Sequence, residues 1–429
     1  MCNLPSPLDP ANINMTIDIP SKLNVAIVGG GIAGLAAAAF LRNQPQFNVT
    51  VYELRSEDWK ESSAALGLQT NGTSIVEQLG ITRQEVRGDT GLGYRTYNIY
   101  EELMSTGRVA FRPDGETGFW FVHRQDLKDA LLRRVTGIHG EGEPIQVVYD
   151  SHIVEIDPAL GILKLVDGHC IEVDLIIGAD GIHSKVREAV IPSSHPDPSL
   201  CGLCVYRFVV PMDTLRDANG RMPDILTLEE GNFVVIIAAG DKGNRNMVIY
   251  PCRELQLMNF VCGVPDTSPR VLAQIKCTGS HESLVNDMLE EFAGFPDWLL
   301  QIFSRTKLIE PFPVLDQKPL PTYVKGRTML IGDAAHAMAP YQAQATNQAL
   351  EDAEGLNVIL ADASSRDSIP GLLKLWDNIR RPHASVVQSD SRDSQAKLST
   401  TKSSDAFLKF KPYVPMKEIL TRISAQSTG

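Results

Sequence analysis

The chain has 429 residues, 43% of them hydrophobic, which is enough for a large core shared by two domains. Its net charge of −12 argues against a nucleic-acid partner, because such proteins usually carry a basic surface. Outside residues 25–41, which four glycines interrupt, no apolar run reaches about 18 residues, so we expect no membrane span.

The N-terminus and the cysteines bear on the cellular compartment. Residues 1–22 are polar and proline-containing, without the basic flank and apolar core of a signal peptide, and we expect a loose leader. Seven scattered cysteines, an odd number, favour reduced thiols and a cytoplasmic location. Cys201 and Cys204 have the C-x-x-C spacing of a dithiol redox site, although two ordinary buried thiols are the favoured interpretation.

The first predicted unit is a strand, a helix and a second strand. An apolar run at residues 25–28 leads into a glycine-rich turn, residues 35–41 are alanine-rich and helix-forming, and residues 48–52 follow as a strand. This order is typical of the first βαβ unit of a dinucleotide-binding domain.

Four residues of this unit have separate physical roles. Gly29 permits the tight turn, Gly31 lets a pyrophosphate approach the backbone, and Gly34 lets the helix lie close to the sheet. Glu53, at the end of the second strand, is placed to accept hydrogen bonds from ribose hydroxyls. The unit predicts adenine-dinucleotide binding, but does not distinguish FAD from NAD.

The elements that follow form two groups with different sequence patterns. Up to residue 193 they are helices and strands around a buried strand that ends at Asp180, whereas from residue 194 to 305 strand-like runs are split by Gly, Asp and Pro, which favours an antiparallel sheet. A core strand at 327–331 and a helix at 342–360 then return to the sequence pattern of the first group. The predicted helices of the first group are 71–79 and a segment from 123, and its strands are 146–148, 153–156, 162–166, 170–173 and 174–177; those of the second are 203–210, 232–238 and 246–250.

Three motifs occur in a fixed order along the chain. The glycine fingerprint ending at Glu53 is followed by D-G-I-H-S-K-V-R at 180–187 and by G-D-A-A-H-A-M-A-P at 332–340. With H-R-Q-D-L at 123–127 and R-R-P at 380–382, this set resembles the single-component FAD-dependent aromatic monooxygenases, the class of salicylate hydroxylase and para-hydroxybenzoate hydroxylase. The resemblance extends from about residue 24 to 391 and looks strongest to fungal secondary-metabolism members.

The resemblance implies an α/β fold in which a Rossmann-like FAD-binding domain carries an inserted antiparallel-sheet substrate domain. We expect the FAD-binding domain to comprise residues 23–98, 119–193 and 308–396, and the substrate domain to comprise 99–118 and 194–307. Residues 397–429 would form a C-terminal tail with a helix.

The resemblance also assigns cofactor contacts. Asp180, which from its position alone is a helix cap, a plain turn residue or a ligand acceptor, would help to handle FAD and the nicotinamide cofactor. Asp333 would hold the ribityl chain, and Arg124 would reach the phosphates or ribityl chain unless it is only a solvated residue at a helix start. His336 either orients its turn, which is favoured, or takes part in catalysis.

Two segments would lie beside the flavin ring. Ala65 belongs to a loop that resembles the family's loop at the isoalloxazine, although Ser63 and Ala65 stand where glycines are common. Thr346 lies in A-Q-A-T-N at 343–347, where relatives carry G-Q-G at the first three positions. Ala343 and Ala345 therefore put normal flavin movement in question, rather than FAD binding.

Arg207 is the candidate catalytic residue. Related fungal oxygenases place an active-site arginine in a similar Y-R or W-R segment, where a cation can bind an anionic substrate or polarise an oxygen species. The alternative is an exposed arginine on a strand.

The implied reaction is a monooxygenation with FAD as cofactor and NADH or NADPH as a transient co-substrate. Through a flavin hydroperoxide, dioxygen would hydroxylate or epoxidise an electron-rich phenol, indole or polyketide, with no metal required. The alternatives are a flavin reductase or dehydrogenase without oxygen insertion, a non-catalytic flavoprotein and, least favoured, an NAD-dependent dehydrogenase. Neither the substrate nor the oligomeric state follows from the sequence.

Overall fold

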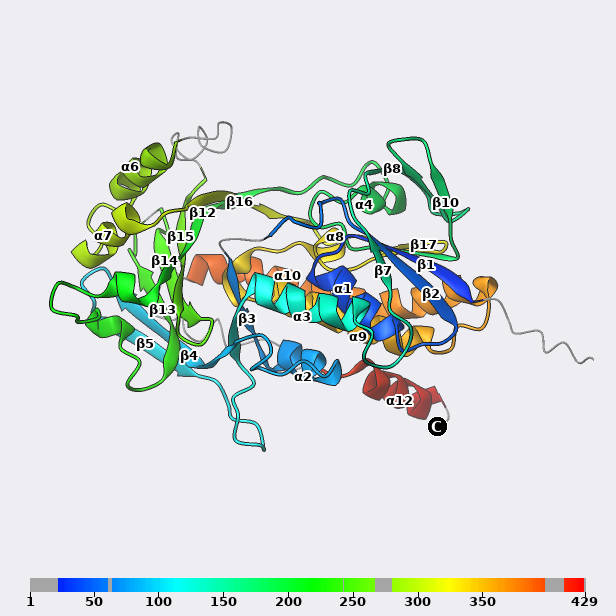
Figure 1. Ribbon diagram of the computed structural model, residues 1–429, viewed down its shortest axis with the longest axis horizontal. Helices are drawn as coiled ribbons and strands as arrows, with labels where there is room; N and C mark the ends of the chain where they lie inside the picture. Colours follow the sequence, from blue (N-terminus) through cyan, green and yellow to red (C-terminus); the bar gives the residue numbers. More distant parts are fainter. Residues whose placement is uncertain (1–21, 61–63, 242, 267–279, 398–412, 428–429) are drawn as a thin grey trace, which may run out of the picture.

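The computed structural model describes residues 22–60, 64–241, 243–266, 280–397 and 413–427. All but the last residue of the predicted leader, and residues 398–412, 428 and 429 of the predicted tail, lie outside these ranges. Figure 1 shows two regions side by side, one built on a parallel sheet around β1 and one built on a larger sheet around β12–β15.

The first region contains a six-stranded sheet in the order β17-β18-β11-β1-β2-β7. Neighbours from β18 to β7 pair in parallel, and only β17 pairs antiparallel, with β18. Because helices cover both faces of such a sheet, its central strands are apolar and buried, as in residues 25–28 and 175–177. The strands are β1 (Leu23–Val28), β2 (Phe47–Tyr52), β7 (Gln146–Val148), β11 (Leu175–Gly178), β17 (Val324–Lys325) and β18 (Thr328–Leu330).

The helices of this region come from distant parts of the chain. Helix α1 contacts both α3 and α9, and α9 also contacts α2, α10 and α12 (Figure 1). Together these helices and the sheet form one continuous apolar core. Their bounds are α1 (Ile32–Leu41), α2 (Thr70–Gln78), α3 (Arg124–Thr136), α4 (Lys185–Val190), α8 (Asp333–His336), α9 (Ala345–Leu360), α10 (Ile369–Lys397) and α12 (Met416–Ser427).

The second region is a nine-stranded sheet in the order β16-β12-β15-β14-β13-β4-β6-β3, with β5 paired to β4. All its pairs are antiparallel except β13 with β4. The strands are β3 (Ala65–Leu68), β4 (Asp89–Asn98), β5 (Leu103–Arg108), β6 (Trp120–His123), β12 (Ser199–Pro211), β13 (Asn232–Ala238), β14 (Asn246–Cys252), β15 (Leu257–Pro265) and β16 (Glu310–Asp316).

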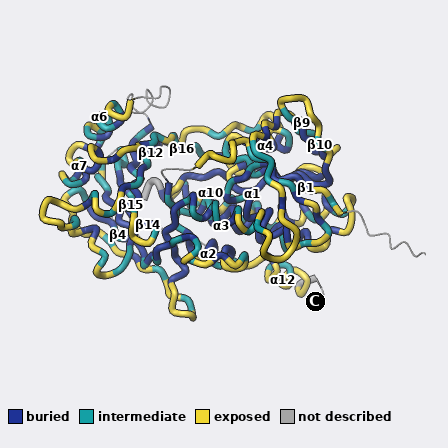
Figure 2. The backbone as a smooth tube through the Cα atoms, viewed as in Figure 1, coloured by how far each residue is buried: buried dark blue, intermediate teal, exposed yellow. Residues whose placement is uncertain are grey.

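The two faces of this sheet bury different residues, because side chains alternate along a strand. On β12, Tyr206 and Phe208 pack with residues of α6 (His281–Glu291) and α7 (Asp297–Arg305). Leu203 and Val205 belong instead to a separate aromatic cluster on the opposite face. Figure 2 shows that the interior of both regions is buried while the loops around them are exposed.

The remaining elements are small. Three antiparallel strands, β8 (Ile153–Asp157), β9 (Ile162–Leu165) and β10 (Cys170–Glu172), form a separate sheet. The 3-10 turns are η1 (Met212–Leu215), η2 (Asp224–Leu226), η3 (Pro340–Gln342) and η4 (Arg366–Ser368). Within the described ranges, no helix has the length and apolar character needed to cross a membrane.

The α/β fold with an added antiparallel sheet is confirmed, and most predicted elements are present. The helix expected from residue 342 begins at Ala345, because residues 340–342 form the 3-10 turn η3 and Ala343 is left-handed. Strands β3, β4 and β6 from the N-terminal half join the larger sheet, so this sheet draws on both proposed domains. The exact domain boundaries stay a prediction.

Candidate active site

A cleft of about 540 Å³ lies at the carboxyl ends of β1, β2 and β11, where the N-terminus of α9 also arrives. Ligands bind at this edge of open α/β sheets, because the loops and helix N-termini gather there. Seven of the residues predicted from the sequence line this cleft: Gly29, Gly31, Glu53, Arg124, Asp180, Asp333 and Thr346.

The glycine turn leaves an open cradle in the cleft wall. Gly29 has a φ of +110°, and a Cβ there would lie 2.3 Å from the carbonyl oxygen of Ala179. A Cβ on Gly34, which does not line the cleft, would lie 2.0 Å from the Gly29 carbonyl oxygen. Among the residues that the structure describes, nothing beyond the chain neighbours of Gly31 and its own helix backbone lies within 4 Å of its Cβ position. The first and third glycines therefore allow close packing of the protein on itself, and the second leaves room for a ligand.

Glu53 holds the glycine turn in place from the end of β2. Its two carboxylate oxygens accept hydrogen bonds from the backbone N–H groups of Gly30, at 2.6 Å, and Arg55, at 2.7 Å. Each oxygen keeps a further lone pair, and the side chain is only partly buried at the cleft. The residue can thus accept from ribose hydroxyls while it fixes the loop.

Asp180 caps the helix that follows it. Its carboxylate accepts from the Ser184 hydroxyl at 2.5 Å and from the backbone N–H groups of Lys185 and Val186 at 2.7 and 3.2 Å. Desolvation raises the pKa of Asp180, and the hydrogen bonds from Ser184 and the backbone oppose the rise. Of the roles expected from its position, the cap is the one the structure shows.

Arg187 joins the second motif to the third. Its guanidinium is buried and donates to the carbonyl oxygens of Ile182 and Ala334. Asp333, beside Ala334, has an exposed side chain that lines the cleft. The two predicted carboxylates are therefore held on neighbouring loops by one cation that the cleft does not expose.

A buried group of charges fixes α9 behind the cleft. Asp352 accepts from the backbone N–H of Gly332 at 2.9 Å and lies 2.5 Å from Nε2 of His336. The Arg380 guanidinium bonds Asp352 at 2.9 Å and Glu351 at 2.7 Å. Burial by itself would raise the pKa of both carboxyls, but the Arg380 charge and the hydrogen bonds from neighbouring groups outweigh it, so both pKa values are lowered. His336 is buried in this network and orients its turn, as favoured from the sequence.

The N-terminus of α9 points its first turn at the cleft. Ala345 and Thr346 line the cleft, and no side chain caps this end of the helix. Ala343, just before it, has a φ of +53°, a left-handed conformation that costs a non-glycine residue about 1–2 kcal/mol. Uncapped N–H groups and the helix dipole favour an anionic or electron-rich ligand atom here.

Several cleft residues escaped the sequence analysis. Trp59 lines the cleft beside Glu53, with the Arg55 guanidinium 5.3 Å and the Lys128 ammonium 5.1 Å from its ring centre. With Arg124 and Lys185, these cations give an acidic protein a cleft suited to phosphates. No local motif marks Arg55, Trp59 and Lys128, because the first two lie in the loop after β2 and Lys128 lies on α3.

Ala65 and Arg207 lie outside the cleft, on the larger sheet. The backbone N–H of Ala65, on β3, donates to Oδ1 of Asn259, on β15, at 3.2 Å. Four strands separate β3 from β15 in the sheet order, so this contact means that the sheet curls toward itself. Arg207, on β12, shares a face with Val205 and places its guanidinium 4.3 Å from the ring centre of Phe312.

An aromatic cluster lies on the face that carries Arg207. Phe119 packs 5.5 Å from Tyr94 and 4.9 Å from Phe121, which is 5.2 Å from Tyr250, all between ring centres. Tyr341, from the turn before α9, joins the same cluster. Burial raises the pKa of Tyr250, and the Arg207 cation opposes only part of that rise.

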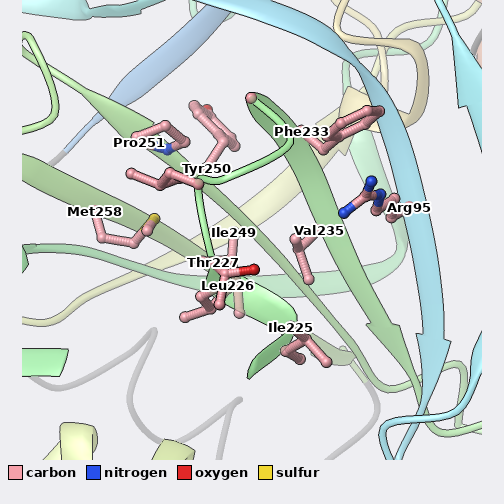
Figure 3. A pocket seen from close by; sticks show the side chains of 12 residues that line it. Arg95, Ile225, Leu226, Thr227, Phe233, Val235, Ile249, Tyr250, Pro251 and Met258 are labelled. Carbon is pink, nitrogen blue, oxygen red and sulfur yellow. The ribbon is translucent and has the colours of Figure 1, made fainter. Parts of the chain in front are cut away.

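The opposite face of the sheet contains a small pocket. Figure 3 shows a pocket lined by Arg95, Phe233, Val235 and Ile249, with Leu226 below and Met258 to the left. Its volume is about 10 Å³, room for about one water molecule. An aromatic ring does not fit there.

The C-x-x-C pair does not have the properties of a redox site. Both cysteines lie on β12, and burial raises the pKa of Cys201 and of Cys204 to about 11. A thiol must be deprotonated to attack, so the interpretation as ordinary thiols is supported.

The open glycine turn, the carboxylate at the end of β2 and the basic cleft are together typical of a dinucleotide-binding fold. Residues 24–173 match the family described as FAD dependent oxidoreductase, and residues 309–391 match the FAD binding domain family. The chain is 30% identical to an FAD-dependent monooxygenase of Aspergillus candidus, over 85% of this chain and 84% of that protein.

Two further relatives are similar over most of their lengths. A salicylate hydroxylase of Pseudomonas putida is 31% identical over 85% of this chain and 83% of its own. The solved structure of 2-methyl-3-hydroxypyridine-5-carboxylic acid oxygenase is 25% identical, with a TM-score of 0.70, over 90% of this chain and 95% of its own. The chain belongs to the family of FAD-dependent monooxygenases that includes salicylate hydroxylase, and FAD is its cofactor.

Proposed function

We propose that this chain uses NAD(P)H and dioxygen to hydroxylate or epoxidise an electron-rich aromatic substrate that carries a negative charge. The observation that carries the substrate class is the position of Arg207 on the sheet face that holds the aromatic cluster. A cation beside aromatic rings in a largely dry site suits an anionic arene.

The cofactor fits the cleft residue by residue. The open side of Gly31 accommodates the pyrophosphate, Glu53 accepts from the adenosine ribose, and Asp333 and Arg124 serve the ribityl chain and phosphates. Thr346 and the first turn of α9, which line the cleft, would contact the flavin ring, and Ala65 on β3 is a further proposed contact. FAD, when bound, supplies the redox chemistry and the activation of dioxygen.

The protein's own part is binding, orientation and exclusion of water. Arg207 holds the anionic group of the substrate, and the rings of Tyr94, Phe121 and Tyr250 cover its apolar face. Water exclusion strengthens the interaction of Arg207 with the substrate, since charges interact more strongly at low dielectric. The cytoplasm is the compartment we propose, given the free thiols at 170, 201, 204, 252 and 262.

The test is oxygen incorporation. The purified yellow holoenzyme should oxidise NADH or NADPH faster when a panel of aromatic acids, including salicylate, is added, and the product should carry one atom from isotopically labelled dioxygen. Stimulated NAD(P)H oxidation without label in any product would contradict the monooxygenase proposal and indicate a flavin reductase.

A further inference from the structure

A second cavity, of about 220 Å³, lies between α9, α10 and the C-terminal helix α12. It is lined by residues from 351–354 on α9, 379–383 on α10 and 413–423, and we call it the C-terminal cavity. Helix α12 packs against α9 (Figure 1), and among the described residues none lines both this cavity and the cofactor cleft. A cavity of about 150 Å³ holds a benzene ring, so this one has room for a ring with a short side chain.

The two sides of the C-terminal cavity differ in chemistry. On α12, Met416, Ile419 and Ile423 line it, and their spacing of three and four residues places them on one face of the helix. On α9, Glu351 and Glu354 line it, again three residues apart on one face. A ligand that matches both sides has an apolar body and a polar group at one end.

Glu354 is a buried carboxylate without a cation as its partner in the described part of the chain. It is 4% exposed, and its Oε2 accepts from the Tyr413 hydroxyl at 2.5 Å and from the backbone N–H of Met416 at 3.3 Å. Its Oε1 has no partner among the described residues and is not fully enclosed by protein atoms. Burial raises the pKa of Glu354, and the two hydrogen bonds oppose part of the rise. A cation at Oε1 would therefore stabilise this carboxylate.

The basic side chains that line the cavity already have acidic partners. Arg380 and His383 both contact the carboxylate of Glu351, at 2.7 and 3.3 Å. Arg422 is exposed and pairs with Glu418, also on α12. The unpaired carboxylate on α9 is therefore left for a ligand.

An organic cation matches the cavity better than a metal ion. Within the ranges that the structure describes, no three His, Cys, Asp or Glu side chains are grouped as metal ligands. A metal ion would also leave the apolar side formed by α12 without a contact. An ammonium group donates up to three hydrogen bonds, and a hydrocarbon body attached to it can cover the apolar side.

We propose that the C-terminal cavity is a binding site for a small amphipathic amine. Its ammonium group donates to Oε1 of Glu354, and its apolar body packs on Met416, Ile419 and Ile423. Charge-assisted hydrogen bonds are about twice as strong as neutral ones, so an amine binds more tightly than an alcohol of the same shape. The site is separate from the proposed aromatic substrate site and does not depend on the proposed function.

The testing variant is E354Q, and the probes are benzylamine and its neutral counterpart benzyl alcohol. A glutamine keeps an acceptor oxygen for Tyr413 and Met416 but removes the charge. We expect E354Q to bind benzylamine about 10- to 100-fold more weakly than the wild type and to change the affinity for benzyl alcohol less than about threefold. The measurement is isothermal titration calorimetry of the full-length, FAD-loaded enzyme with each probe.

E418Q is the matched control, because it removes the same charge from the exposed side of α12. It should bind benzylamine as the wild type does. If E354Q folds poorly, I423W provides a second test, since a larger side chain at this partly exposed position reduces the space in the cavity. I423W should weaken the binding of both probes, whereas E354Q should weaken only that of the amine.

Four outcomes would overturn the inference. Wild-type enzyme that binds no benzylamine at millimolar concentration, or binds both probes equally well, has no amine site of this kind. An unchanged benzylamine affinity in E354Q, or an equal loss in E418Q, shows that the ammonium does not meet this carboxylate. None of these results bears on oxygen incorporation, so the proposed monooxygenase activity is tested separately.

Discussion

The cofactor cleft and the aromatic face of the larger sheet are built in different ways. In the cleft, the contacts depend on backbone geometry, such as the missing side chain at Gly31 and the uncapped first turn of α9. On the sheet face, they depend on side chains from separate strands, such as Arg207 and Tyr250. A backbone site has a local sequence motif, whereas a side-chain site set by strand register has none.

Because of this division, changes in each region should have separable effects on FAD binding and on substrate binding.

The largest effect is expected behind the cleft. R380M would leave Glu351 and Asp352 buried without their cation and should lower the free energy of unfolding by about 3–5 kcal/mol. Because α9 is held by these charges, FAD retention should fall too. Thermal unfolding and the visible absorbance of the purified protein measure both.

R381M is the control for R380M. Arg381 is partly exposed and pairs with Asp377 four residues away, so its loss should cost less than about 1 kcal/mol. Equal destabilisation by both variants would mean that the buried charges do not anchor α9.

The next two variants distinguish a loss of folding stability from a loss of FAD binding within the glycine turn. G34A would place a Cβ 2.0 Å from the Gly29 carbonyl oxygen, so we expect a loss of about 3 kcal/mol of stability. G31A has no protein atom near its added methyl group and should leave the stability of the apoprotein unchanged, while it weakens FAD binding at least about tenfold. Denaturant titration of the apoproteins and FAD titration distinguish the two. A large loss of apoprotein stability in G31A would contradict the open cradle.

On the sheet face, R207M should leave FAD content and stability near the wild-type values. It should weaken binding of an anionic arene such as salicylate about 10- to 100-fold, because a charge-assisted contact is lost. R95M is its control: Arg95 lies on the same sheet over Phe233, pairs with Glu230 and lines the small pocket of Figure 3. Loss of FAD from R207M, or an equal loss of salicylate affinity in R95M, would show that cofactor binding and substrate binding do not divide between the two regions.

The smallest expected effect concerns Asp89, at the start of β4. Burial raises its pKa to about 6, above the unfolded value of about 4. Its contribution to stability is therefore complete below pH 4 and is lost as the pH rises through 6. D89N keeps an acceptor for the backbone N–H of Leu255 and should be more stable than the wild type by about 1 kcal/mol at pH 8, allowing for solvent screening. The free energies of unfolding of D89N and the wild type, measured by denaturant titration, should converge near pH 4. A difference between them that stays constant with pH would show that Asp89 does not titrate in this way.

The sequence predicted the cofactor half in detail and the substrate half only in outline. The strand–turn–helix at Gly29, the acid at Glu53 and the strand ends at Asp180 and Asp333 follow from local rules of chain geometry. The left-handed backbone of Ala343 does not, since neither propensity nor hydrophobic pattern favours it, although the departure from glycine there was visible.

Amino-acid order alone predicted that this chain binds an adenine dinucleotide, because the fingerprint from Gly29 to Glu53 lies within one strand–helix–strand unit. Only the tertiary structure brought Asp352 to His336 and Asn259 to Ala65, which are 16 and 194 residues apart along the chain. Such pairs depend on helix packing and on the curl of a sheet, and these are set by the whole core rather than by any segment. The residues proposed to face the substrate were likewise brought together only by the tertiary structure.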